Sequence, residues 1–170
     1  MPVTRDVLKI GTGPFQLTYG SDSLGYTKGD AKFSYTPNYR PRQVDEMGQT
    51  PIDYVLGGEE LKVTVTLKQE QVGLLLLVIP EGLAGGTTKW YMGRKPGGKA
   101  SDHAKILELT PIDTTTTSIS KIHFWKAVVI DPIEKAFSWE SDSDFAVTFT
   151  ILADTTKSDG QYLGYVQYAS

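Results

Sequence analysis

Few residues in this chain of 170 have the types and spacing that catalysis requires. The nearest approach is Ser101, Asp102 and His103, a hydroxyl, a carboxylate and an imidazole in consecutive positions. A catalytic triad is assembled in space from separate elements, and sequence neighbours in a Gly- and Lys-rich segment rarely form one. We therefore interpret these three residues as part of a solvated loop, and the sequence predicts no catalytic residues and no enzyme.

Candidate metal ligands are equally sparse. The chain has no cysteine and only 2 histidines, which excludes disulfides and thiolate chemistry. Glu140, Asp142 and Asp144 supply carboxylates, but no glycine and no closing glutamate complete a calcium-binding loop around them. A hydrated turn is the better interpretation. His123, between two apolar residues, is expected to be hydrogen-bonded or at an interface, and the sequence predicts no metal and no cofactor.

Phosphate and nucleic-acid binding are also disfavoured. The glycine pairs at Gly85-Gly86 and Gly97-Gly98 do not lie between a strand and a helix, as a phosphate-binding turn must. The 17 Lys and Arg residues are outnumbered by 20 Asp and Glu residues, so the net charge is -3. An acidic balance does not suit a protein that holds nucleic acid by its phosphates.

The elements that would position any site are mostly strands, as 17 glycines and 9 prolines suggest. Within 59–69 and within 144–152, apolar and polar residues alternate, which indicates half-buried antiparallel strands. The apolar positions are Leu61, Val63, Val65 and Leu67 in the first, and Phe145, Val147, Phe149 and Ile151 in the second. Further strands are predicted at 15–19, 32–36, 89–92, 105–110 and 121–130.

One helix is predicted, over 70–79. Val72, Leu75, Leu76 and Ile79 have helical spacing, but other positions are apolar too, so the helix should be buried. A buried strand is the alternative. The apolar run is far shorter than the ~20 residues that cross a bilayer, so no membrane span is expected. The first residues lack the apolar stretch of a secretory signal, which predicts a protein made and kept in a cytoplasm.

The stretch between Tyr35 and Tyr54 is unusual in composition. It contains Pro37, Pro41 and Pro51, two arginines and a tyrosine among polar residues. Prolines at this density exclude a central strand. We therefore predict one domain, 1–170, that carries a long interaction loop at about 36–53.

The order and spacing of these features resemble the tail tube proteins of long-tailed bacteriophages. Ser23 to Gly29 (SLGYTKG) is similar to a turn found in that family, and Asp45 to Asp53 (DEMGQTPID) is similar to its long-loop motif. The segment from Gly57 to Glu59 then precedes the alternating strand and the leucine-rich helix, and the sequence Leu152-Ala153-Asp154 resembles the family's closing strand.

The resemblance implies a mainly β fold, an antiparallel β-sandwich or open barrel with one flanking helix. It implies a structural virion protein whose subunits form hexameric rings, which stack into a tail tube that conducts DNA. The partners would be other copies of the chain, the tape measure, terminator and baseplate proteins, and genomic DNA in transit. Assembly would take place in the host cytoplasm.

The same resemblance suggests two sets of site residues. The loop residues expected to contact a neighbouring subunit or ring are Tyr35, Tyr39, Arg40, Arg42, Asp45 and Asp53. The residues expected to face the lumen are Glu60, Lys62, Thr64, Thr66, Lys68, Asp144, Thr148 and Thr150. The sign of the lumen charge stays open, because lysines and acidic residues alternate on the first of these strands.

Two alternatives remain. The chain could be another ring component of the same fold, a terminator or a baseplate protein. It could instead be a monomeric β-sandwich that binds carbohydrate through exposed aromatic residues, with Trp90, Tyr91, Trp125 and Trp139 as candidates. Trp125 is expected to be buried, since it lies in a nearly continuous apolar strand.

Overall fold

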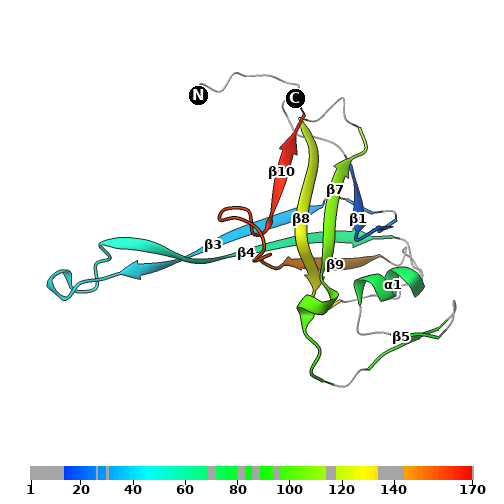
Figure 1. Cartoon of the computed structure of the whole chain (residues 1–170), viewed down its shortest axis with the longest axis horizontal. Coiled ribbons are helices and arrows are strands. Elements are labelled where there is room, and N and C mark those ends of the chain that lie inside the picture. Colours follow the sequence, from blue (N-terminus) through cyan, green and yellow to red (C-terminus); the bar gives the residue numbers. More distant parts are fainter. Residues whose placement is uncertain are drawn as a thin grey trace.

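The computed structural model describes residues 14–25, 27–29, 31–68, 72–79, 83–85, 89–93, 96–113, 118–133 and 144–169. In these residues the fold is mainly β, as predicted (Figure 1). The strands are β1 (Phe15–Tyr19), β2 (Asp22–Ser23), β3 (Lys32–Arg42), β4 (Asp53–Leu67), β5 (Leu83–Ala84), β6 (Trp90–Tyr91), β7 (Lys105–Pro111), β8 (Ile119–Val129), β9 (Phe145–Ile151) and β10 (Gly164–Tyr168). The helical elements are α1 (Val72–Val78) and two 3-10 turns, Asp45–Met47 and Ala100–His103.

The main sheet is antiparallel and has the strand order β2-β1-β7-β8-β9-β4-β3. Strand β8 organises it, because its first half pairs with β10 and its last residues, Ala127 to Val129, pair with β9. The sheet therefore divides at β8. In Figure 1 the axes of the antiparallel strands β7, β8 and β10 are upright, and β9, β4 and β3 cross them.

The core lies between these two crossing groups of strands. The apolar positions of the alternating strands are all buried, and the register places Val63 opposite Phe149 and Val65 opposite Val147. Tyr19 of β1 is also buried, with its ring 5.1 Å from that of Phe149 and its hydroxyl donating to the carbonyl oxygen of Ala127 at 2.9 Å. The period-two prediction is thus confirmed for both strands.

The helix is confirmed over a shorter range, and the alternative of a buried strand is wrong. Leu74 and Val78, one turn apart, are its buried residues and belong to the core cluster, whereas Leu75 and Leu76 are half-buried. The most buried face of the helix therefore differs from the predicted face, which contained Leu75 and Leu76. No helix in the described part of the chain is long and apolar enough to span a membrane.

The segment predicted as a long loop at about 36–53 is mostly a β-hairpin, so β3 extends beyond the predicted strand end at residue 36. Strands β3 and β4 pair continuously from Lys32 opposite Thr64 to Arg42 opposite Asp53, and only residues 43–52 connect them. Prolines are tolerated because β3 is terminal in the order of the described strands, and none of these strands bonds to the outer side of its backbone. Figure 1 shows the hairpin projecting far from the body. We call residues 37–59 the arm.

Strand β10 was not predicted. It begins at Gly164, whose φ of 156° is rarely adopted by other residues, and a Cβ there would overlap the backbone carbonyl of His123. Glycine therefore allows the chain to approach β8 closely enough for pairing. The segment 154–163 before it runs against the body, where the amide of Trp125 donates to the carbonyl oxygen of Leu163.

Candidate functional site

The arm exposes large apolar side chains. Tyr39 and Tyr54 are 57% and 59% exposed, and Leu56 and Val55 are also exposed. At the tip, Met47 is exposed in the same way. A two-stranded ribbon is barely stable alone in water, and contiguous exposed apolar groups usually mark an interaction site.

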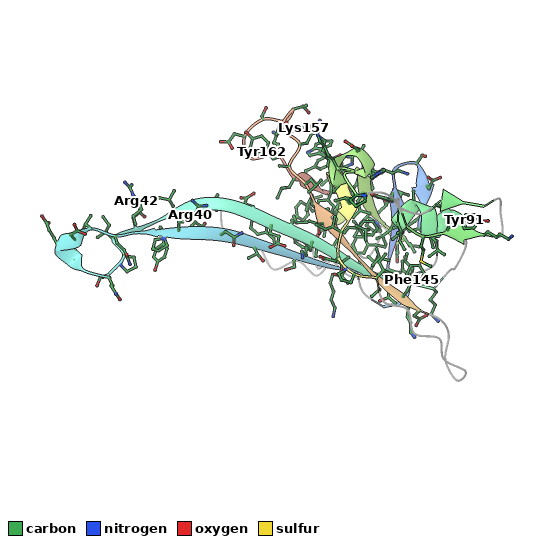
Figure 2. All side chains as sticks on the ribbon, turned by 90° about the horizontal axis from the view of Figure 1, so that it is seen from below. Arg40, Arg42, Tyr91, Phe145, Lys157 and Tyr162 are labelled. Atoms are coloured by element: carbon green, nitrogen blue, oxygen red, sulfur yellow. The ribbon has the colours of Figure 1, made fainter. Side chains whose placement is uncertain are left out.

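The register separates the side chains of the outer arm by face. Tyr39 is opposite Leu56, whereas Arg42 is opposite Asp53. Because neighbours along a strand point to opposite faces, the tyrosine and the arginines lie on different faces. Figure 2 shows Arg40 and Arg42 pointing to the same side of the arm. The structure thus places the predicted contact residues on the arm, except Tyr35, which lies just before it, and it separates Tyr39 from the face that carries Arg40 and Arg42, which we call the basic face.

A β-bulge in the otherwise continuous pairing separates the arm's outer half from its base. The register shifts between Asn38 and Tyr39, and Gly58 has a φ of 153°, which favours glycine. Arg40 lies across Gly57, where an added Cβ would be 3.0 Å from the Arg40 Nε atom. The Arg40 side chain therefore packs over the glycine backbone of its own arm.

The remaining predicted contact residues have local roles as well. The Asp53 carboxylate accepts a hydrogen bond from the amide of Tyr54 at 2.7 Å, and Asp45 lies in the 3-10 turn at the tip. At the base of the arm, the Tyr35 hydroxyl donates to Glu59 Oε1 at 2.7 Å. This hydrogen bond is the first cause that raises the pKa of Tyr35 above its ordinary value.

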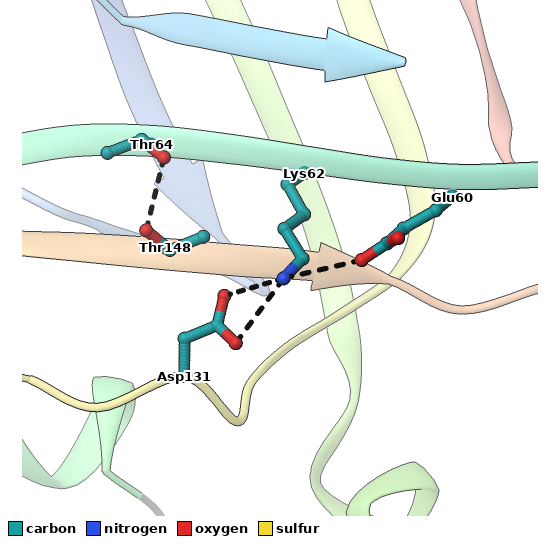
Figure 3. Close-up of polar contacts among 5 residues, drawn as sticks. All are labelled: Glu60, Lys62, Thr64, Asp131 and Thr148. Carbon is teal, nitrogen blue, oxygen red and sulfur yellow. Dashed lines mark hydrogen bonds and ion pairs between the residues drawn. The ribbon is translucent and has the colours of Figure 1, made fainter. Parts of the chain in front are cut away.

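The predicted lumen-facing residues form a polar face on β4 and β9. The register places Lys62 opposite Thr150 and Thr64 opposite Thr148, and the two latter hydroxyls are 3.1 Å apart (Figure 3). All four side chains are half-buried, and so is Thr66. The structure therefore brings most of this set together, which confirms that they share one face. Their exposure to a lumen stays a prediction.

The charges of this polar face are paired. Lys62 Nζ lies 3.1 Å from Asp131 Oδ2 and 3.3 Å from Glu60 Oε1 (Figure 3). The hydrogen bond with Asp131, followed by that with Glu60, raises the pKa of Lys62 above its ordinary value. Asp144 pairs with Lys28 at 2.6 Å. Lys68 directly follows β4 and is exposed. Asp131 was missed because it follows β8 and meets Lys62 only in the folded chain.

A groove opens between the base of the arm and the C-terminal segment, with a volume of about 680 Å³. We call it the root groove. Most of its lining is aliphatic or aromatic, and Glu59 and Asp159 supply two carboxylates; the aromatic side chains include Phe33, Tyr35, Tyr162 and Tyr165. The sequence did not suggest it, since its two walls are about a hundred residues apart in the chain. Its volume lies within the range of ordinary ligand sites, about 300–1,000 Å³.

A second cluster surrounds His123 on β8. Its Nδ1 atom lies 2.7 Å from Glu108 Oε1, and its ring stacks on Tyr165 with centroids 5.0 Å apart. An ionised carboxylate only accepts hydrogen bonds, so Nδ1 carries the proton. The expectation of a hydrogen-bonded histidine is confirmed. Trp125 is half-buried rather than buried, and its indole N–H donates to the Gln161 carbonyl at 2.9 Å.

Replacing Glu108 by Gln should make the free energy of unfolding depend less on pH in the acidic range. The pKa of Glu108 is below its ordinary value, first because of His123 and then because of Lys121. A carboxyl group whose pKa is lowered by folding stabilises the fold when the pH is above the ordinary pKa of glutamate, about 4.3. This contribution is lost as the pH falls through the lowered pKa. We expect Glu108→Gln to lower the free energy of unfolding by about 1 kcal/mol at neutral pH.

Urea denaturation of both proteins near pH 7 and near pH 3 measures this effect. The difference between Glu108→Gln and the unmodified chain should narrow at the lower pH. Glu46→Gln, at an exposed position of the arm tip, is the matched control and should change little at either pH. If Glu108→Gln lowered the free energy of unfolding equally at both pH values, the ionised Glu108 carboxylate would not be the source of the stabilisation.

The residues considered first for chemistry do not form a reactive site in the described chain. Ser101 and Asp102 are exposed in the second 3-10 turn with His103. Among the described residues, no three His, Asp or Glu side chains are grouped as metal ligands. Glu140, Asp142 and Trp139 lie outside the described residues, and so does the side chain of Trp90. Tyr91 is exposed on β6.

Comparison with known proteins adds no assignment to this geometry. No protein-family model matches the sequence, and a search of curated proteins finds no match.

Proposed function

We propose that this chain is a structural subunit that assembles into hexameric rings, and that these rings stack into the tail tube of a long-tailed bacteriophage. The observation that carries the proposal is the arm. It projects from the body and exposes aromatic and aliphatic side chains over much of its length, and no other element of the described chain covers them. An apolar ribbon of this kind is stable in water when a partner buries it.

The edges of the sheet support assembly through further contacts. In the described strand order, β3 is terminal and has β4 as its one neighbour. Its outer edge therefore offers backbone groups to another strand, a feature that monomeric proteins usually protect. Pro37 and Pro41 interrupt the donors of this edge. We infer that β3 is selective about the strand it accepts, which suits defined subunit contacts rather than aggregation.

The polar face suits the wall of a DNA conduit. A lysine binds phosphate by releasing counterions, and that contribution is reduced when carboxylates already neutralise it. Lys62 has two such neighbours, Glu60 and Asp131, so this cluster of three charges carries net negative charge at neutral pH. The wall would let DNA slide without holding it.

Electron microscopy of negatively stained protein tests the proposal by morphology. At high protein concentration we expect rings with an open centre, and stacks of such rings. Single rings that never stack would instead favour a terminator or baseplate component of the same fold. A uniform field of small particles that bind immobilised glycan would favour a carbohydrate-binding module and would overturn the proposal.

A further inference from the structure

The root groove has the chemistry of a site for an arginine side chain. Tyr162 and Tyr165 are partly exposed at its wall, and Glu59 and Asp159 supply carboxylates. A guanidinium stacks on aromatic rings and bonds carboxylates through its planar set of N–H donors. Asp159 is exposed and has no ion pair among the described residues. The groove thus combines both kinds of partner that a guanidinium binds well.

Arg42 on the arm is an arginine suited to this groove. It is exposed and, within the part of the chain described, forms no ion pair, whereas the side chain of Arg40 packs over Gly57. Val55 projects from the same face as Arg40 and is exposed, so the basic face also brings apolar surface. The arm and the root groove are therefore complementary in both charge and polarity.

The arm cannot place Arg42 in the root groove of its own chain. The groove extends along the arm as far as Leu56, which is opposite Tyr39, and Arg42 is three residues further along β3. At about 3.3 Å per residue this separation is about 10 Å, and Arg42 points to the opposite face of the arm from Tyr39 and Leu56. Continuous pairing with β4 as far as Asp53 keeps the strand extended. The arginine must therefore bind elsewhere.

We propose that the root groove of one subunit receives the arm of a second copy of this chain, with Arg42 bound against Asp159 and Tyr162. This inference rests on the proposed assembly and specifies the surface that accepts the arm. The contact joins two different surfaces, so its head-to-tail repetition produces closed rings or continuing stacks. Each subunit then contributes one arm and one groove.

Exchanging the two charges tests this contact. Arg42→Glu places a carboxylate against Asp159, and Asp159→Arg places a guanidinium against Arg42. Either change alone should raise the protein concentration needed for assembly by at least about tenfold, because like charges then meet at the contact. The chain that carries both changes should assemble near the unmodified concentration, since attraction is restored with reversed polarity.

Mixing the two single variants gives a sharper result. In an alternating arrangement, the carboxylate introduced at position 42 of one variant would meet the guanidinium introduced at position 159 of the other. Each remaining contact would pair the original Arg42 and Asp159. An equimolar mixture should therefore assemble although neither variant does so alone. Lys99→Glu, a reversal at an exposed residue away from both surfaces, is the matched control and should assemble normally.

The outcomes separate this inference from the proposed function. If the unmodified chain forms rings and both single variants do so at the same concentration, the groove assignment is wrong while the assembly role stands. If the unmodified chain forms no rings, the proposed function itself fails. If the single variants assemble normally and the groove tyrosines respond to added maltoheptaose in NMR spectra, the groove is a carbohydrate site and the proposal is overturned.

Discussion

Replacing residues 39–57 by Asn-Gly should produce a folded monomer that no longer assembles. Asn38 and Gly58 are paired in the native hairpin, so a two-residue turn can join them and keep the rest of the β3–β4 register. None of the residues removed is buried, and the core strands are untouched. The variant should therefore lose the surface that we propose drives association and retain the body of the fold.

Sedimentation velocity measures the loss of assembly, and circular dichroism measures whether the fold is retained. The truncated chain should sediment as a monomer at concentrations where the unmodified chain assembles, with a β spectrum and a melting temperature close to those of the unmodified monomer. Ser34→Ala, at an exposed position of β3 outside the arm, serves as a control that should assemble normally. A truncated chain that still polymerised would show that the arm is dispensable.

Replacing Phe149 by Ala should cause one of the largest losses of stability in the molecule. Phe149 is fully buried on β9, opposite Val63 and Val129 of its two neighbouring strands, and its ring contacts Tyr19. Removing a buried phenylalanine side chain costs about 3–5 kcal/mol, because the cavity closes only in part. For a chain of this size we expect the melting temperature to fall by roughly 10 °C.

Phe33→Ala is the matched control for this effect. Phe33 lies opposite Val63 on the other side of β4, but it is 58% exposed at the edge of the root groove. Its removal should lower the free energy of unfolding by less than about 1 kcal/mol. Equal losses for the two variants, measured by urea denaturation of the monomers, would contradict the placement of the core between the crossing strands.

The core strands could be predicted because each buries one face. The alternation around Val65 and around Val147 is a local signal that survives in a single sequence, since a slip by one residue would expose every apolar side chain. The arm lacks that signal, because both of its faces are exposed, and its residues form strands through the pairing of β3 with β4. Pro37 and Pro41 favour a loop when the sequence is considered alone, whereas in the structure they lie in a strand at the edge of the described sheet.

The surfaces depend on contacts that a local pattern does not contain. The root groove joins the base of the arm to a segment about a hundred residues later in the chain, through β10, which pairs with the first half of β8. The pairing of Lys62 with Asp131 similarly requires the end of β8 to lie beside β4. The polar face itself was predictable, since its threonines are the solvent-side residues of the same alternating strands.

The mass distribution of the purified, full-length chain over a range of concentrations tests the central claim most directly. Mass photometry, supported by sedimentation velocity at higher concentration, counts the subunits in each species. The proposal predicts a monomer in equilibrium with particles of six subunits and with multiples of six. A strict monomer at every concentration up to the solubility limit, with the arm intact, would contradict it.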